Sequence, residues 1–76
     1  MYNYTVNKIK NFEFVNKENE DYKYLIWMCN EIQKMNDTFK SARWIGYALR
    51  MAEELGFWDN KLSRDYIRKD VENGDY

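Results

Sequence analysis

The strongest constraint on the fold comes from residues 38–71, which have the pattern of two helices separated by a glycine. In the first part, apolar side chains recur every three or four residues in two adjacent rows, the spacing of a helix with two apolar neighbours. Gly56 follows, and glycine commonly ends a helix in the left-handed conformation. Asp59 can then cap a new helix. We therefore predict helices over 38–55 and 60–71. The two rows are Ala42, Ile45, Leu49 and Ala52, and Trp44, Ala48, Met51 and Leu55.

An earlier helix is predicted over 21–36. Its apolar side chains fall at i, i+3, i+4, i+7 and i+10, which places them on one face; they are Leu25, Met28, Cys29, Ile32 and Met35. Asn19 or Asp21 can cap its start, and Asn36 or Asp37 can cap the helix that follows. The short polar connection between these two helices predicts a helical hairpin.

The first 16 residues have a different pattern. Tyr2, Tyr4 and Val6 alternate with polar residues, which is typical of a half-buried strand. This predicts an extended arm or a β-hairpin over 1–16, and residues 72–76 are expected to fray. The predicted fold is therefore mainly α: one three-helix domain, made of a helical hairpin and a short C-terminal helix, with an extended or β-hairpin N-terminal arm.

Size and aromatic content favour self-association. A chain of 76 residues buries only about 60–65% of its unfolded surface, so its core is marginal. Cys29 is the only cysteine and there is no histidine, which excludes an intrachain disulfide and disfavours a zinc site. Three Trp, seven Tyr and four Phe are more aromatic side chains than so small a core easily hides. We therefore expect a homo-oligomer.

Charge and hydropathy bear on the partners and the location. The net charge is −1 and the charges are interspersed, which disfavours nucleic-acid binding. No apolar stretch approaches the roughly 20 residues of a transmembrane helix, so no membrane partner is expected. The first residues lack the pattern of a signal peptide. With a lone cysteine, this indicates a reducing cytoplasm.

Enzymatic chemistry has little support. Without histidine, a Ser or Cys nucleophile lacks its usual base, and the three glycines are isolated, so no phosphate-binding glycine loop is present. Cys29 lies on the apolar face of the 21–36 helix and is interpreted as a core residue. We therefore predict no enzyme, no catalytic residues, no metal site and no cofactor.

Two polar patterns are candidates for binding. Lys40, Arg43, Tyr47 and Arg50 fall on one stripe of the 38–55 helix; the stripe is either a solvated face paired with nearby glutamates or a surface for a nucleobase or an acidic loop.

The second pattern is Arg64-Asp65-x-x-Arg68. It is either a clamp that holds the last helix on the preceding one or an anion site. Gly46 lies inside a helix at a cost of about 1 kcal/mol relative to alanine, which suggests that a backbone or an aromatic ring approaches closely there.

Residues 40–68 resemble a segment of small uncharacterised accessory proteins of tailed bacteriophages. The shared form is Lys-x-x-Arg-Trp-Leu-Gly-Phe, a glycine thirteen residues after the arginine, and a capped helix with Arg-Asp-x-x-Arg. The matching residues here are Lys40, Arg43, Trp44, Gly46, Gly56, Arg64, Asp65 and Arg68, while Ile45 and Tyr47 are close substitutes. The resemblance implies a phage or prophage gene product that acts in the cytoplasm of a bacterial host.

The hypothesis that combines these observations is a non-enzymatic phage accessory protein that binds and inhibits a host bacterial protein, plausibly a component of antiviral defence. An alternative is an oligomeric sponge that sequesters a nucleotide signal molecule, and a weaker alternative is a nucleic-acid-binding module. The residues expected to bind the partner or an anion are Lys40, Arg43, Trp44, Tyr47, Arg50, Trp58, Arg64 and Arg68.

Overall fold

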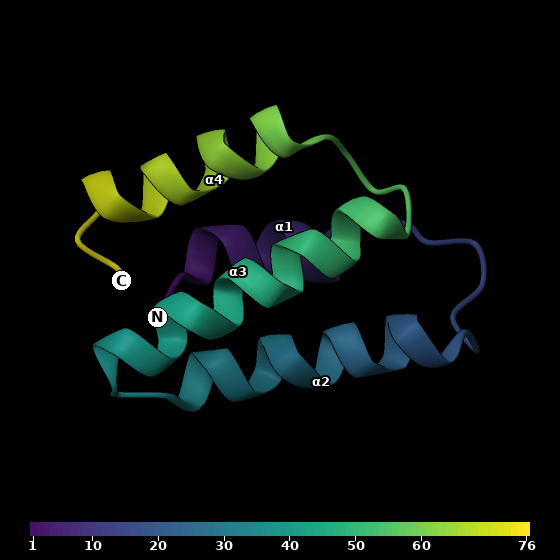
Figure 1. Cartoon of the computed structure of the whole chain (residues 1–76), viewed down its shortest axis with the longest axis horizontal. Helices are drawn as coiled ribbons and strands as arrows, with labels where there is room; N and C mark the ends of the chain where they lie inside the picture. Colours follow the sequence, from purple (N-terminus) through teal and green to yellow (C-terminus); the bar gives the residue numbers. More distant parts are fainter.

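The computed structural model describes all 76 residues and consists of four helices. They are α1 (Asn3–Asn11), α2 (Glu20–Lys34), α3 (Thr38–Glu54) and α4 (Asn60–Glu72). In Figure 1, α2 and α3 form an antiparallel hairpin, α1 lies behind α3, and α4 lies on the side of the molecule opposite α2. The mainly α prediction is confirmed, but the number of helices is four rather than three.

Side-chain caps define the starts of the last three helices. Asn19, Asp37 and Asp59 each accept a bond of 3.0 Å from the backbone N–H three residues on, as expected for N-caps. The end of α3 is equally regular. Gly56 has φ +88°, and the N–H of Phe57 donates to Ala52 O at 3.0 Å, which is a Schellman motif. Local signals therefore determine these boundaries.

The prediction of an extended or β-hairpin arm over 1–16 is wrong, because residues 3–11 form α1. The buried side chains are Tyr2, Thr5, Val6 and Ile9, which follow the three-to-four residue spacing of a helix. Tyr2 and Val6 belong to this set as well as to the alternating set. The short segment therefore fits both periods, and burial of Ile9 requires the helical one.

The C-terminus holds the start of α1 in place. Asp70 in α4 is fully buried and accepts the N–H groups of Tyr4 at 2.9 Å and Thr5 at 3.0 Å, as well as the hydroxyl of Thr5. Asp75 accepts the N–H of Asn3 at 2.9 Å. The expectation that residues 72–76 fray is therefore wrong, since they contact the first turn of α1.

The helices α1, α2 and α3 enclose one apolar core, and α4 packs against it through the half-buried Ile67. The core residues are Tyr2, Val6, Ile9, Leu25, Met28, Cys29, Ile32, Ile45, Ala48, Leu49, Ala52 and Phe57. The predicted core position of Cys29 is confirmed, since this side chain has no exposed surface. An aromatic cluster closes one end of the core, where Phe57 stacks on Phe12 with 4.2 Å between ring centroids.

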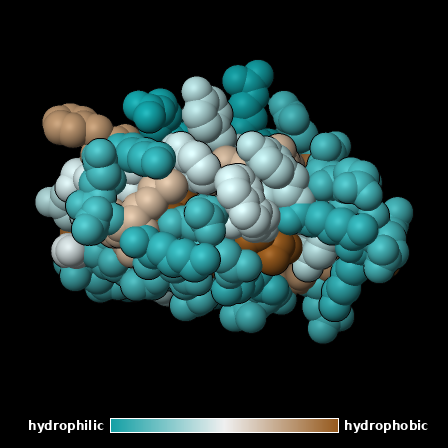
Figure 2. All heavy atoms as spheres, turned by 90° about the horizontal axis from the view of Figure 1, so that it is seen from below, coloured by the Kyte–Doolittle hydropathy of each residue, from teal (hydrophilic) through white to brown (hydrophobic).

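Several aromatic side chains remain exposed on the α2 side of the molecule. Tyr24 is 52% exposed, Trp27 46% and Tyr47 59%. Figure 2 shows this side, with pale and brown side chains gathered between hydrophilic ones. No helix combines the length and the apolar character needed to cross a lipid bilayer.

Burial of Cys29 predicts a loss of stability at alkaline pH. Desolvation raises the pKa of this thiol from 9.0 to about 12, and the charge of Lys10 opposes the shift only partly. Since the pKa is higher in the folded state, the stabilisation is fully present below pH 9 and is lost as pH rises toward 12. The free energy of unfolding should fall by about 1.4 kcal/mol per pH unit in this range.

Urea denaturation at a series of pH values measures this effect. The control is Cys29→Ala, which should be less stable than the wild type at pH 8 but approach it as the pH rises. Burial and the charges of Asp70 and Tyr76 also raise the pKa of Tyr2. This shift is the same in both proteins, so it cancels when their free energies of unfolding are compared. If the difference in the free energy of unfolding between the wild type and Cys29→Ala stayed constant up to about pH 11, the prediction would be contradicted.

Candidate functional site

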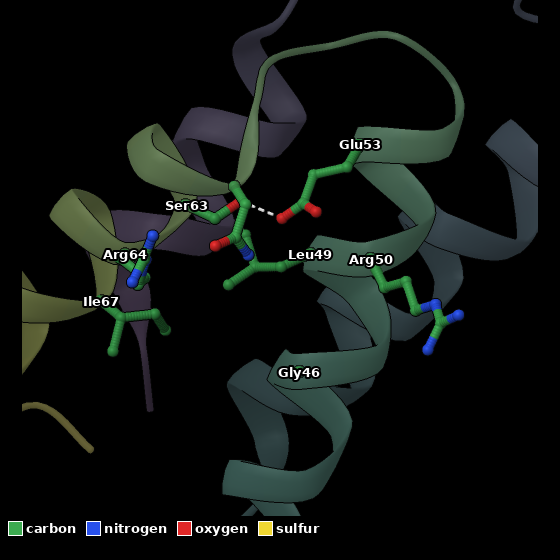
Figure 3. A pocket seen from close by; sticks show the side chains of 8 residues that line it. Gly46, Leu49, Arg50, Glu53, Ser63, Arg64 and Ile67 are labelled. Carbon is green, nitrogen blue, oxygen red and sulfur yellow. Dashed lines mark hydrogen bonds between the residues drawn. The ribbon is translucent and has the colours of Figure 1, made fainter.

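The helices α3 and α4 diverge from the turn at Gly56 and leave a groove between them, which we call the α3–α4 groove (Figure 3). Its volume is about 460 Å³. Each helix contributes four lining residues: Gly46, Leu49, Arg50 and Glu53 from α3, and Asn60, Ser63, Arg64 and Ile67 from α4. The groove is open because α4 packs mainly on α1 and only lightly on α3.

Two hydrogen bonds that share the Ser63 hydroxyl close one end of the groove. The Ser63 hydroxyl donates to Glu53 Oε2 at 2.6 Å, and the Trp58 indole N–H donates to Ser63 Oγ at 2.9 Å. Figure 3 shows the Glu53 side chain directed from α3 toward Ser63 on α4. The two bonds tie the helices together at this end of the groove and occupy the Glu53 carboxylate.

The two arginines of the groove differ in their surroundings. Arg50 pairs with Glu54 at 3.4 Å, and its side chain extends away from α4 in Figure 3. Arg64 takes part in none of the ion pairs of the structure. Since Arg64 is exposed, its guanidinium is available to an anionic group that enters the groove.

Gly46 lines the groove in the middle of α3. A methyl group added to it would meet no heavy atom within 4 Å, so the explanation of this glycine by a close approach within the chain is wrong. Glycine at this position therefore lowers the stability of the helix by about 1 kcal/mol relative to alanine, and no contact within the fold requires it. Beside it, Leu49 and Ile67 supply the apolar part of the groove.

Lys40 and Tyr47, from the predicted stripe, lie outside the groove on the side of α3 toward α2, whereas Arg43 lines neither groove. Lys40 Nζ lies 5.6 Å from the centroid of the Trp44 ring, and Trp44 in turn packs against Trp27 with 5.7 Å between centroids. Tyr47 lines a second hollow, between α2 and α3. Arg43 is exposed and has no ion-pair partner. The stripe thus divides between two surfaces, and Arg50 lines both.

The remaining predicted residues, Trp58 and Arg68, have local roles. Trp58 is half-buried against Phe12 and Tyr66 and donates to Ser63. Arg68 pairs with Asp65 at 3.4 Å within α4, where both are exposed. The clamp between the last two helices is therefore not formed by the Arg64-Asp65-x-x-Arg68 cluster; the Ser63 bond to Glu53 takes that place.

Six of the eight lining residues were not in the predicted site: Gly46, Leu49, Glu53, Asn60, Ser63 and Ile67. Asn60, Ser63 and Ile67 follow the spacing i, i+3 and i+7, which indicates one face of α4, but nothing in the sequence indicates that this face looks toward α3. Glu53 is one of the glutamates near the predicted stripe, and its place close to the end of the predicted 38–55 helix is typical of a solvated face. Its bond to Ser63 depends on the turn at Gly56, which brings residues ten positions apart together.

Neither models of known protein families, nor curated proteins, nor solved structures match this chain. Nowhere do three or more His, Cys, Asp or Glu side chains gather at positions that could hold a metal ion. The physical features of the α3–α4 groove are therefore the basis on which its function is proposed.

Proposed function

We propose that this chain is a binding protein that receives a short acidic segment of a partner protein in the α3–α4 groove. The observation that carries the proposal is the combination of Gly46 with open space above it and an unpaired Arg64 on the facing helix. A glycine lets a partner backbone approach α3 closely. Leu49 and Ile67 offer contact to an apolar side chain, while Arg64 pairs with a carboxylate next to it.

The biological setting that we propose rests on the resemblance of residues 40–68 to phage accessory proteins. In that setting, the partner is a host bacterial protein, such as a component of antiviral defence, and occupation of the groove occludes a segment that the host protein needs. The action takes place in the host cytoplasm and requires no chemistry by this chain.

The nucleotide sponge is the second candidate. The phosphates of a bound nucleotide would bind Arg64, but no aromatic side chain lines the α3–α4 groove. A base would therefore lack the stacking platform that favours nucleotide recognition. A nucleotide that binds should raise the free energy of unfolding by about 2.7 kcal/mol at 100 times its dissociation constant. This stabilisation, measured by thermal unfolding, would favour the sponge over the binding of a peptide segment.

Variants that separate binding from folding test the proposal. Gly46→Leu should raise the free energy of unfolding by up to about 1 kcal/mol, because it removes a helix-destabilising glycine, yet should fill the groove and exclude the segment. Arg64→Glu should reverse the charge of the groove without loss of stability, since Arg64 has no partner in the fold. Lys61→Glu is the control, because Lys61 is exposed on α4 and lies outside the groove.

The measurement is quantitative mass spectrometry after crosslinking and affinity purification of the tagged chain from bacterial cells. A host polypeptide should accompany the wild type and Lys61→Glu in stoichiometric amounts, and its recovery should fall about tenfold or more with Gly46→Leu and Arg64→Glu, which corresponds to about 1.4 kcal/mol of binding. A polypeptide that is recovered equally with all four proteins would show that the groove is not the binding site.

A further inference from the structure

A second surface, formed by α2 and α3, is separate from the α3–α4 groove except for Arg50. It contains a hollow of about 420 Å³, which we call the α2–α3 groove. The hollow is lined by Tyr24, Met28, Tyr47, Arg50, Met51 and Glu54. Four of these side chains are apolar or aromatic, and Tyr, Met and Arg are the types enriched at protein interfaces.

Aromatic rings extend this apolar surface along α2. Tyr24 stacks on Trp27 with 5.5 Å between ring centroids, and Trp27 lies 5.7 Å from Trp44. The rings hold one another in place, so little side-chain entropy remains to be lost when a partner covers them. Three half-exposed aromatic side chains on one face of a chain this small indicate an interaction surface.

The charges beside the hollow indicate that its partner is a second copy. Arg50 and Glu54 are one helical turn apart on α3 and are 80% and 69% exposed. An isologous interface pairs residue i with j and j with i, so a twofold axis that passes between these two side chains would place Arg50 of each copy opposite Glu54 of the other. The surface therefore complements itself both in charge and in its apolar content.

The area that such a contact requires is a modest part of the surface of this chain. A dimer of standard size buries about 800 Å² from each copy, which is about a sixth of the 5027 Å² that one chain exposes. The helices α2 and α3, of 15 and 17 residues, lie side by side and offer two lengths of about 22–25 Å.

From these features we infer that the chain forms a twofold dimer through the α2–α3 groove and the rings of Tyr24, Trp27 and Tyr47. The dimer contact includes Arg50 but neither Gly46 nor Arg64, so the part of each α3–α4 groove between these two residues stays open. Each dimer then presents two partner-binding grooves, and bivalent binding raises avidity where two partner segments lie within reach.

Charge exchange at Arg50 and Glu54 tests this arrangement by sedimentation equilibrium. The wild type should be dimeric at about 100 µM, since assembly depends on protomer concentration. Glu54→Arg alone and Arg50→Glu alone should each weaken the dimer about tenfold or more, because like charges then face each other across the axis. The double variant R50E/E54R should restore the dimer, since the opposite charges again face each other.

Two further variants complete the test. Tyr47→Glu should give monomers with an unchanged far-ultraviolet circular dichroism spectrum, because Tyr47 is exposed in the single chain. Arg64→Glu should remain dimeric, so a failure of the dimer and a failure of the proposed groove function are distinguishable. A wild type that is monomeric at about 100 µM, or a double variant that stays as weak as the single ones, would overturn the inference.

Discussion

Replacement of Asp70 by asparagine should destabilise the protein by about 3 kcal/mol, the largest effect expected of any polar substitution here. Asp70 has no exposed surface. One carboxylate oxygen accepts the N–H of Tyr4, while the other accepts both the N–H and the hydroxyl of Thr5. An amide would present an NH₂ group to at least one of these donors, so a buried bond would be replaced by a repulsive contact.

The size of the effect follows from what α1 lacks. Its own N-cap residue, Tyr2, has a left-handed backbone with φ 56° and makes no side-chain cap bond. A nine-residue helix is too short to be stable by itself. The carboxylate of Asp70 therefore provides the cap from α4, and its charge also interacts favourably with the positive end of the helix dipole.

Thermal and urea unfolding of the wild type and Asp70→Asn would measure the loss. For a domain of this size, 1 kcal/mol shifts Tm by about 4–8 °C, so a fall of roughly 12–24 °C is expected. Asp75→Asn is the matched control: Asp75 also accepts an N–H at the start of α1, but it is partly exposed and should cost about 1 kcal/mol or less. If both variants unfold together, burial of the Asp70 carboxylate adds nothing to its role as a cap.

Asp70 also explains which part of the fold could be predicted from the sequence. The helices α2, α3 and α4 each carry their caps within the same segment, at Asn19, Asp37 and Asp59, so a local pattern is enough to place them. The cap of α1 lies 65 residues away from Thr5. Because no local signal marks the start of that helix, the alternation of Tyr2, Tyr4 and Val6 was misleading.

The same distinction applies to the candidate site. The arginine and aromatic side chains of α3 share a helix face, so their periodicity reveals them in the sequence. Whether that face looks toward α2, α4 or solvent depends on the angle between α3 and α4, which the turn at Phe57 and Trp58 determines. The facing residues Ser63 and Ile67 therefore became part of the site only through tertiary structure.

The apolar side chain on which this turn depends is Phe57. It is 7% exposed and contacts rings from three parts of the chain: Phe12 after α1, Tyr22 at the start of α2, and its neighbour Trp58. Phe14 adds a further contact, at 5.4 Å between centroids. Most of these contacts join segments far apart in the sequence, so their loss affects the arrangement of the helices rather than the helices themselves.

Phe57→Ala should therefore lower the free energy of unfolding by about 3–5 kcal/mol, because it removes buried aromatic surface and leaves a cavity. That is a large share of the total stability of a 76-residue domain, about 4–11 kcal/mol at 0.05–0.15 kcal/mol per residue. Urea denaturation followed by tryptophan fluorescence measures the loss, since Trp58 lies 5.7 Å from the Phe57 ring.

Phe39→Ala is the control for this substitution, because it removes the same atoms from a side chain that is 86% exposed. Its effect should stay within about 0.5 kcal/mol of zero. Phe57→Ala should also affect the α3–α4 groove, because the Trp58 indole donates to Ser63. Displacement of this indole should loosen the Ser63 bond to Glu53 and open the closed end of the groove. Equal urea midpoints for Phe57→Ala and Phe39→Ala would mean that burial of the Phe57 ring does not stabilise the fold.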